Sequence, residues 1–251
     1  MLSGIFRQAE DDDIILRSPC RIRGASASRS SREPQVLSLA ELLALTEAMP
    51  AHYRAMTLIC GLCGLRFGEA AGLRRQDLAL DQSLLHVRRG VVRVAGRKEL
   101  SQPKTPAAVR TVTMPAIAVA ELKAHLETLP KGGRTSLIFP GADGEPLAST
   151  SLYGRKARTE KRRNGLTYVK SAYGFYAARE AIGRPDLHWH DLRRTAATLG
   201  AQSGATVREM QHRLGHTTPT MALHYQAATI DRDRFISERL QAAIDQHTAA
   251  S

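Results

Sequence analysis

The amino-acid sequence predicts a mainly α-helical domain that carries a small three-stranded antiparallel β-sheet, which is an α+β fold. One observation is a central stretch, residues 84–113, in which β-branched and polar residues alternate as in short strands. The other is that segments with capping residues and helical apolar spacing dominate on both sides of this stretch. With 251 residues and 43% apolar content, the chain can form one sizeable domain plus a fragment.

The first 36 residues differ in composition from the rest of the chain. A short amphipathic piece at 2–9 is followed by a run of acids and then by a linker rich in Ser, Gly and Ala at 24–31. We therefore expect residues 1–36 to be the remnant of another domain plus a linker, and residues 37–251 to form the main domain.

Capping signals predict the helices of the main domain. Ser38 and Glu41 form a capping box that opens a helix to about Met49, and a second helix ends near Cys63. The other expected elements are strands at 84–94, 98–102 and 110–113, and helices at 117–129, near 168–182, at 192–199 and at 207–214. The three strands would pair into the antiparallel sheet.

The helix at 192–199 begins beside two side chains that suit an anion. Asp191 is expected to cap this helix, whose apolar residues define an inward face and leave Arg193 pointing away from the core. His190 lies three residues earlier and is expected on the same side of the helix start. Because free N–H groups also favour an anion there, a phosphate would fit.

A second histidine and a tyrosine follow at close spacing. Gly215 ends the helix at 207–214 and supplies a permissive backbone just before His216. Thr218 and Pro219 are expected to start a turn of helix that carries Tyr225. Two imidazoles, a guanidinium and a phenol are the groups needed to bind a phosphodiester and attack it, so the pattern indicates DNA strand transfer through a phosphotyrosine.

These residues resemble the tyrosine recombinase or phage integrase family. That family has a His-x-x-Arg phrase, here His190 and Arg193, then Leu-Gly-His, here ending at His216, and the nucleophilic tyrosine nine residues later, here Tyr225. The interval of 23 residues from Arg193 to His216 also matches. The resemblance extends from residue 38 to about residue 246 and implies the fold of the family's catalytic domain.

Two further phrases of the family precede these residues. Its Gly-Leu-Arg-x-x-Glu phrase is matched with Arg66 and Glu69, and its lysine in a turn before an Arg-x-Val strand is matched by Lys104. One departure is Arg194, where the family often has a second histidine. Another departure is a longer basic stretch before His190.

The resemblance implies a role for each matched residue. Arg66 and Arg193 would bind the non-bridging phosphate oxygens, since a planar guanidinium matches phosphate in a bidentate way. Glu69 would orient an arginine or a histidine. No metal, cofactor or ATP is required in this scheme.

The same resemblance implies how the proton moves. Tyr225 would attack and form a 3′-phosphotyrosine while His190 accepts its proton. His216 would hydrogen-bond the phosphate, and Lys104 would act as the general acid for the departing 5′ oxygen. Taken singly, each residue could have an ordinary structural role, but their joint order and spacing favour the enzymatic interpretation.

Two other functions are compatible with parts of the sequence. A helix-turn-helix at 196–214 would suit a non-enzymatic DNA-binding regulator, and a type IB topoisomerase would use the same phosphotyrosine chemistry. Zinc binding is disfavoured because His212 and His216 have no accompanying HExxH phrase. Cys60 and Cys63 have redox spacing but lie in an apolar helix, so they are expected in the core.

The charge of the chain favours a polyanionic partner. Its net charge is +12 and its pI is about 10.2, which suits double-stranded DNA. The residues expected to contact DNA, or else to form a solvated face, are Arg155, Lys156, Arg158, Lys161, Arg162 and Arg163. An odd count of three cysteines and the lack of a long apolar span predict a cytoplasmic protein without membrane contact. The resemblance to the recombinase family implies that it is bacterial and DNA-associated.

The family also implies a larger assembly on its DNA attachment sites. Its members are usually two-domain clamps, so we expect this chain to be truncated, with only the end of the core-binding domain, and to bind DNA weakly with little site-specific recombination. Four protomers act together in the family, which implies a tetramer on DNA, with a monomer in solution also open. The apolar stripe at 233–247 would dock on a neighbouring protomer or on its own core.

Overall fold

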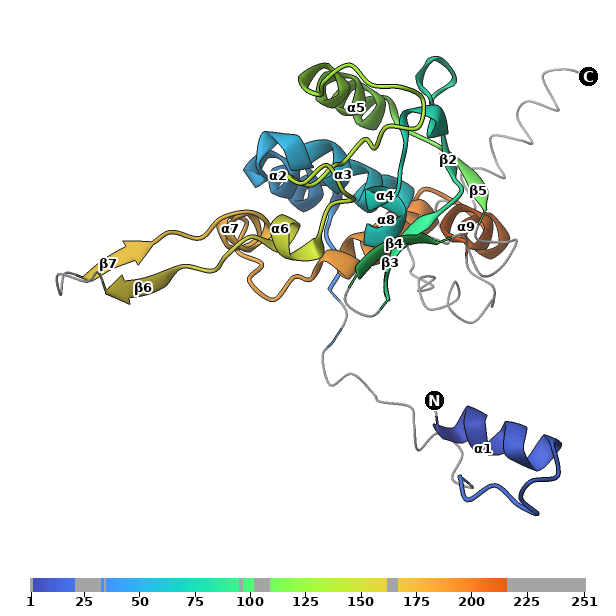
Figure 1. The fold of residues 1–251 in the computed structure, drawn as a ribbon. Helices are drawn as coiled ribbons and strands as arrows, with labels where there is room; N and C mark the ends of the chain where they lie inside the picture. The colour runs from blue at the N-terminus through green and yellow to red at the C-terminus, as the bar shows by residue number, and fades with distance from the viewer. Residues whose placement is uncertain are drawn as a thin grey trace, which may run out of the picture. The chain divides into compact units, whose positions relative to one another are not determined.

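The computed structural model describes residues 2–20, 33, 35–94, 97–101, 109–161 and 167–215. The chain divides into two units, Met1–Pro34 and Gln35–Ser251 (Figure 1). The described part of the first unit contains one helix, α1 (Leu2–Asp11), which extends slightly beyond the predicted range of 2–9. All further elements belong to the second unit.

Helix α3 (Ala51–Cys63) forms the centre of the second unit. Nine of its thirteen residues are buried, because α2 (Leu39–Ala48), α5 (Ala116–Thr128) and α8 (Trp189–Gln202) contact it from different sides. A helix that is apolar on most of its surface is expected at such a central position. Each fully buried leucine or isoleucine there contributes about 1.5–3 kcal/mol.

The predicted start of α2 is confirmed in detail. The Ser38 hydroxyl accepts from the Glu41 backbone N–H at 3.2 Å, and the Glu41 carboxylate accepts from the Ser38 N–H at 2.7 Å. Two orphaned N–H groups of the first turn are satisfied in this way. The predicted ends of α3 and α9 (Val207–Leu214) are also confirmed, since Gly64 and Gly215 adopt the left-handed conformation with φ of 72° and 66°.

The three-stranded antiparallel sheet exists, but two of its strands differ from the prediction. Its order is β1 (Leu78–Ala79), β2 (Leu84–Val87) and β5 (Arg110–Thr113), while β3 (Gly90–Val94) and β4 (Arg97–Ser101) pair separately as a hairpin. The predicted strand at 84–94 is therefore split. The break falls at Arg88 and Arg89, whose guanidiniums turn toward the fully buried Asp77 carboxylate in the short 3-10 helix Arg75–Asp77. A second 3-10 helix, Leu80–Gln82, connects β1 to β2.

A second hairpin occupies the basic stretch, where the sequence predicted helix from about 168 onward. Strand β6 (Arg158–Lys161) pairs with β7 (Thr167–Lys170), and the hairpin extends away from the helices of the unit (Figure 1). Helix α6 (Ser149–Tyr153) precedes it, and helix α7 (Phe175–Ala181) starts seven residues later than expected. The prediction failed because Gly174, with φ of 69° and ψ of −147°, prevents a continuous helix.

Helices α8 and α9 complete the described part of the second unit. Helix α8 packs on α3 and α9, and α9 also contacts strand β5. The predicted turn at Thr218 and Pro219, Tyr225 and the helix at 233–247 lie outside the described residues. Among the helices that are described, none has the length and hydropathy that a membrane span requires.

Candidate active site

Four of the seven residues predicted to form the catalytic site lie in the described part of the chain. They are Arg66, Glu69, His190 and Arg193. Lys104, His216 and Tyr225 lie outside the described residues. The structure brings the four described residues together from two segments that are more than 100 residues apart.

Arg66 is held at the start of helix α4 (Phe67–Ala71). The left-handed Gly64 ends α3, so the chain turns sharply and Arg66 becomes the N-cap of the next helix. Its backbone N–H donates to Glu69 Oε2 at 2.9 Å, and its Nη1 donates to Glu69 Oε1 at 2.7 Å. The side chain nevertheless remains 43% exposed, so Arg66 is anchored and still accessible from solvent.

Glu69 is a buried carboxylate surrounded by guanidiniums. Arg110 donates to both carboxylate oxygens, at 3.2 Å and 2.9 Å, and Arg193 Nη1 lies 3.9 Å from Oε2. Burial alone would raise the pKa of Glu69, but the hydrogen bonds and charge of Arg110, with Arg66 and Arg193, bring that pKa below its ordinary value. The carboxylate therefore stays ionised and orients the arginines around it.

Arg193 is buried, and the prediction that it points away from the core was wrong. Its side chain is only 4% exposed, and it donates from Nη1 to the Gly64 carbonyl at 2.6 Å and from Nη2 to the Leu214 carbonyl. A guanidinium can be buried at this position because the ends of α3 and α9 offer carbonyl acceptors that no helix hydrogen bond uses.

The cap of α8 also differs from the prediction. The helix starts at Trp189, and Asp191 is its third residue, not its cap. The Asp191 carboxylate accepts from the His188 backbone N–H at 2.8 Å, which completes the first turn from inside the helix. The shift places His190 in the first turn of α8.

His190 is exposed, and the positive charges of several arginines act on its imidazole. Partial desolvation lowers the pKa of its imidazole, and the charges of Arg193, Arg194 and Arg66 lower it further, against a smaller opposite effect of Asp191. The imidazole is therefore neutral at pH 7 and has a lone pair with which to accept a proton.

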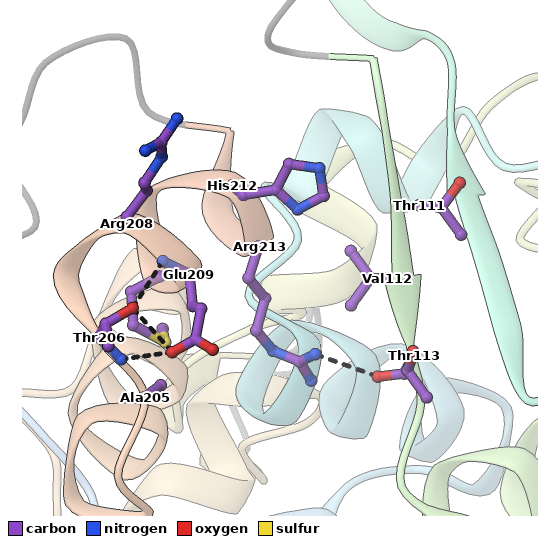
Figure 2. Close-up of a pocket in the computed structure, with 10 residues that line it drawn as sticks. Thr111, Val112, Thr113, Ala205, Thr206, Arg208, Glu209, His212 and Arg213 are labelled. Carbon is purple, nitrogen blue, oxygen red and sulfur yellow. Dashed lines mark hydrogen bonds between the residues drawn. The ribbon is translucent and has the colours of Figure 1, made fainter.

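Two further arginines belong to the site, and the sequence interpretation assigned no role to either. Arg110 Nε donates to the Arg213 carbonyl at 2.8 Å. The Arg213 side chain donates to the Thr113 carbonyl at 3.2 Å, as Figure 2 shows, and to the Leu62 carbonyl at 3.1 Å. The alternation of β5 is the sequence signal that could have placed Arg110 inward, because Arg110 and Val112 share the buried face.

A pocket of about 660 Å³ adjoins this cluster between α9 and β5 (Figure 2). Thr206 caps α9 on one wall, where its hydroxyl and backbone N–H both donate to the Glu209 carboxylate. Thr111 and Thr113 of β5 lie on the opposite wall. The pocket thus borders the helix that leads directly to Gly215.

The basic residues predicted to contact DNA lie around the second hairpin. Arg155 donates to the Ser171 carbonyl at 3.0 Å, and the Lys156 ammonium lies 5.3 Å from the centre of the Tyr176 ring. Arg158 is 66% exposed and pairs with Glu160 at 2.6 Å. Only the backbone of Lys161 is described, and Arg162 and Arg163 lie outside the described residues.

The two helical cysteines lie in the core, as predicted. Cys60 and Cys63 are fully buried and form no disulfide. Burial raises the pKa of both thiols, that of Cys63 to about 11. These thiols are therefore protonated packing groups. Within the described ranges, no group of three His, Cys, Asp or Glu side chains is arranged to hold a metal ion.

The family model described as the phage integrase family matches residues 32–232 of this chain. The chain belongs to the phage integrase family. This family member is 38% identical over 242 residues to the prophage phiRv2 integrase of Mycobacterium tuberculosis, an alignment that covers 96% of the chain and 60% of that protein. The integrase of Mycobacterium phage L5 is 35% identical, with the same coverage of 96% and 60%. The chain thus spans about three fifths of the length of these relatives.

Solved structures confirm the fold class of this phage integrase family member. The Tn1549 transposon integrase in complex with a circular intermediate DNA superposes with a TM-score of 0.70 at 20% identity, over 95% of this chain and 76% of that one. The XerA recombinase gives a TM-score of 0.58 at 19% identity, over 83% and 65%. The mainly α fold with small antiparallel sheets is therefore a tyrosine recombinase fold.

Proposed function

We propose that this chain is the catalytic part of a site-specific DNA recombinase that cuts and rejoins strands through a 3′-phosphotyrosine, without ATP or a metal ion. The observation that carries this proposal is the convergence of Arg66 and Arg193 on the Glu69 carboxylate, beside His190. Two guanidiniums at one point suit the two non-bridging oxygens of a phosphodiester. We assign residues 37–251 to the catalytic domain, and 1–36 to the end of a core-binding domain and its linker.

The guanidiniums would stabilise the transition state. Negative charge builds on the phosphate oxygens as phosphorus becomes pentacoordinate, and Arg66 and Arg193 remain charged throughout. Glu69 holds Arg66 in place, and the Gly64 and Leu214 carbonyls hold Arg193, so little reorganisation is needed when the substrate binds.

The proton balance assigns the remaining roles. The Tyr225 oxygen would form the bond to phosphorus and give its proton to the neutral His190, while the bond to the 5′ oxygen breaks and Lys104 protonates that oxygen. His216 would donate a hydrogen bond to the phosphate. The phosphotyrosine ester conserves the bond energy, so a free 5′ hydroxyl of another strand can reverse the step.

Double-stranded DNA attachment sites are the proposed partner. The Tn1549 integrase and a lambda integrase dimer have been solved bound to DNA, the latter to a core site. We infer that this chain binds a duplex in the same way and assembles as a tetramer on it. The net charge of +12 supports a polyanionic partner.

The second hairpin would add a contact to the DNA backbone. Residues 155–170 include seven basic side chains and one acidic side chain, a surplus of six charges in a chain whose total is +12. Arg155, Lys156, Arg158, Lys161, Arg162 and Arg163 are the proposed DNA-binding residues. Arg155 and Lys156, which lie against aromatic rings, support the root of the hairpin as well.

Two glycines, one before and one after this hairpin, fix the backbone at its base. Gly154 and Gly174 both have φ of 69° with ψ near −131° and −147°, conformations that other residues avoid. A Cβ on Gly174 would lie 2.8 Å from the Leu152 carbonyl oxygen and 3.1 Å from the Gly154 Cα. The two chain segments at the base of the hairpin are therefore in backbone contact. This contact fixes the base of the hairpin and supports the proposal that its basic residues form a DNA-binding surface.

Covalent trapping tests the proposed function. In a library of nicked duplexes with randomised sequence, cleavage a few nucleotides 5′ of the nick frees the short strand that lies between the cleavage site and the nick. Its 5′ hydroxyl is lost with it, so a protein–DNA adduct accumulates and the captured DNA can be sequenced. We expect an adduct with the wild-type chain and none with Tyr225→Phe, at equal DNA binding. A wild type without adduct under conditions of DNA binding would favour the DNA-binding regulator. Resealing within one strand, with no transfer to a second duplex, would favour a type IB topoisomerase.

A further inference from the structure

We propose that Arg110 is a positioning residue of this site, although it does not face the phosphodiester. This inference rests on the proposed function. Arg110 would hold Glu69 in a fixed place, so that Arg66 makes only one side-chain hydrogen bond to it and Arg193 stays at 3.9 Å. The remaining N–H groups of both arginines would then be available for the phosphate. Arg110 would also fix the backbone that leads into His216.

The position of Arg110 follows from strand β5. Arg110 and Val112 point inward while Thr111 and Thr113 point outward, and the Arg110 side chain is 1% exposed. Its guanidinium makes hydrogen bonds of 3.2 Å and 2.9 Å to Glu69 and one of 2.8 Å to the Arg213 carbonyl. One buried side chain thus connects the carboxylate of α4 with the end of α9.

The end of α9 receives two guanidiniums. The last carbonyls of a helix have no partner within it, and they lie at the negative end of its dipole. Arg110 binds the carbonyl of Arg213, and Arg193 binds that of Leu214. The next residues are Gly215, in the left-handed conformation, and His216. The last turn of α9 is therefore held from β5 and α8.

Arg110 supplies most of the side-chain hydrogen bonds that compensate the buried negative charge of Glu69. Arg110 contacts both carboxylate oxygens, whereas Arg66 makes one side-chain hydrogen bond and Arg193 remains at 3.9 Å. A buried carboxylate without Arg110 would be costly, and the nearest positive groups that could replace it are Arg66 and Arg193. A further hydrogen bond from Arg66, or a direct one from Arg193, would turn N–H groups of these arginines away from a bound phosphate.

A purely structural ion pair would give a different outcome. Loss of such a pair lowers stability but leaves the chemical step unchanged in molecules that remain folded. Loss of a positioning residue slows the step itself, and a displacement of about 1 Å can cost about 100-fold. The two roles are separated by rates measured well below the unfolding temperature of every variant.

The test compares Arg110→Met and Arg110→Lys with the wild-type chain. The nicked duplex recovered with the wild-type chain serves as the probe, and the single-turnover rate of adduct formation is measured at saturating protein. We expect Arg110→Met to lower this rate about 100-fold with DNA affinity changed less than threefold. Arg110→Lys restores the charge without the planar fork, so we expect an intermediate rate, and it also serves if Arg110→Met does not fold.

The test includes a matched control variant and a second substitution that should partly restore the rate lost in Arg110→Met. Arg179 is another buried arginine, which donates to the Leu187 carbonyl outside the proposed site, so Arg179→Met should keep the rate within threefold. The double variant Arg110→Met/Glu69→Gln removes the charge that would attract Arg66 and Arg193, and we expect it to react at least about 10-fold faster than Arg110→Met.

Two results would overturn the proposal about Arg110 alone. One is a rate within threefold of wild type for folded Arg110→Met or Arg110→Lys. The other is a double variant that is as slow as Arg110→Met or slower. A wild-type chain that forms no adduct at all overturns the proposed function, and the role of Arg110 falls with it.

Discussion

His190 illustrates how neighbouring charges tune one residue for its role. Desolvation lowers the pKa of its imidazole below the ordinary value of 6.5, and three arginines add to the effect. Arg193 and Arg66 belong to the proposed phosphate site, so the groups that would bind the substrate also keep the proposed base neutral. Arg194, the residue that departs from the expected family pattern, contributes in the same direction.

On the acidic side, the rate of adduct formation should therefore fall at a lower pH than it would with an ordinary imidazole as the base. The base must be deprotonated, and its lowered pKa moves the loss of activity to more acidic pH. Arg194→Gln removes a positive charge, so it should raise the pKa of His190 and move the acidic limb of the pH–rate profile toward higher pH. Arg208→Gln, which removes an exposed charge that does not affect His190, should leave it unchanged. Identical limbs for wild type and Arg194→Gln would contradict the assignment of His190 as the base.

At the scale of elements, the backbones of α4 and β3 approach so closely that the contact leaves no room for a side chain. A Cβ built on Gly68 would lie 2.5 Å from the Val91 carbonyl oxygen, and Gly90 lies against the same turn of helix. The backbone of the β3–β4 hairpin can thus approach the helix that carries Arg66 and Glu69. Strand β4 of the same hairpin ends at Ser101, three residues before Lys104 in the sequence.

Gly68→Ala should therefore damage both stability and activity. Overpacking against a backbone oxygen costs about 1–3 kcal/mol, which exceeds the gain in helix propensity of about 0.5–1 kcal/mol. We expect a net loss of about 1 kcal/mol in the free energy of unfolding, measured by urea titration, and slower adduct formation. Gly133→Ala is the matched control, because a Cβ there meets nothing within 4 Å. Equal stability of the two variants would argue against the close contact.

At the scale of the whole molecule, the distribution of charge is uneven. Half of the net charge of +12 comes from residues 155–170, which include the second hairpin. Within the hairpin, Glu160 partly compensates Arg158 and Lys170, at 2.6 Å and 3.7 Å. The sequence Lys161-Arg162-Arg163 follows directly and has no acidic neighbour beyond Glu160.

The affinity for DNA should consequently depend steeply on salt concentration. The basic residues of the hairpin should account for a measurable part of this salt dependence. Each phosphate contact contributes about 0.9 to the slope of log K against log salt. The triple variant Lys161→Gln, Arg162→Gln and Arg163→Gln should lower the slope by about 2–3, measured by fluorescence anisotropy with duplex DNA. A control that removes the exposed charges of Lys123, Lys131 and Arg134 should leave the slope within about 0.5 of wild type. Equal slopes for the two triple variants would exclude the hairpin from the DNA interface.

Features that depend on neighbouring residues were predictable from the sequence. The capping box of Ser38 and Glu41, the ends of α3 and α9 and the mainly α class all follow from hydrogen bonds and apolar spacing within a few residues. The pairing of strands was less predictable, because the alternation at 84–94 is compatible with one strand or two. Arg88 and Arg89 decide between them by turning toward Asp77, a contact that spans 11 and 12 residues.

By itself, the sequence determined which chemical groups this protein has and in what order, since spacing and residue type carry that information directly. Only the tertiary structure decided that Arg193 is buried against carbonyls 129 and 21 residues away, and that Arg110 joins Glu69 across 41 residues. Such contacts depend on how α3, α8, α9 and β5 pack against one another. Packing is a property of the whole core, and a buried charge is stable only where that core supplies its partners.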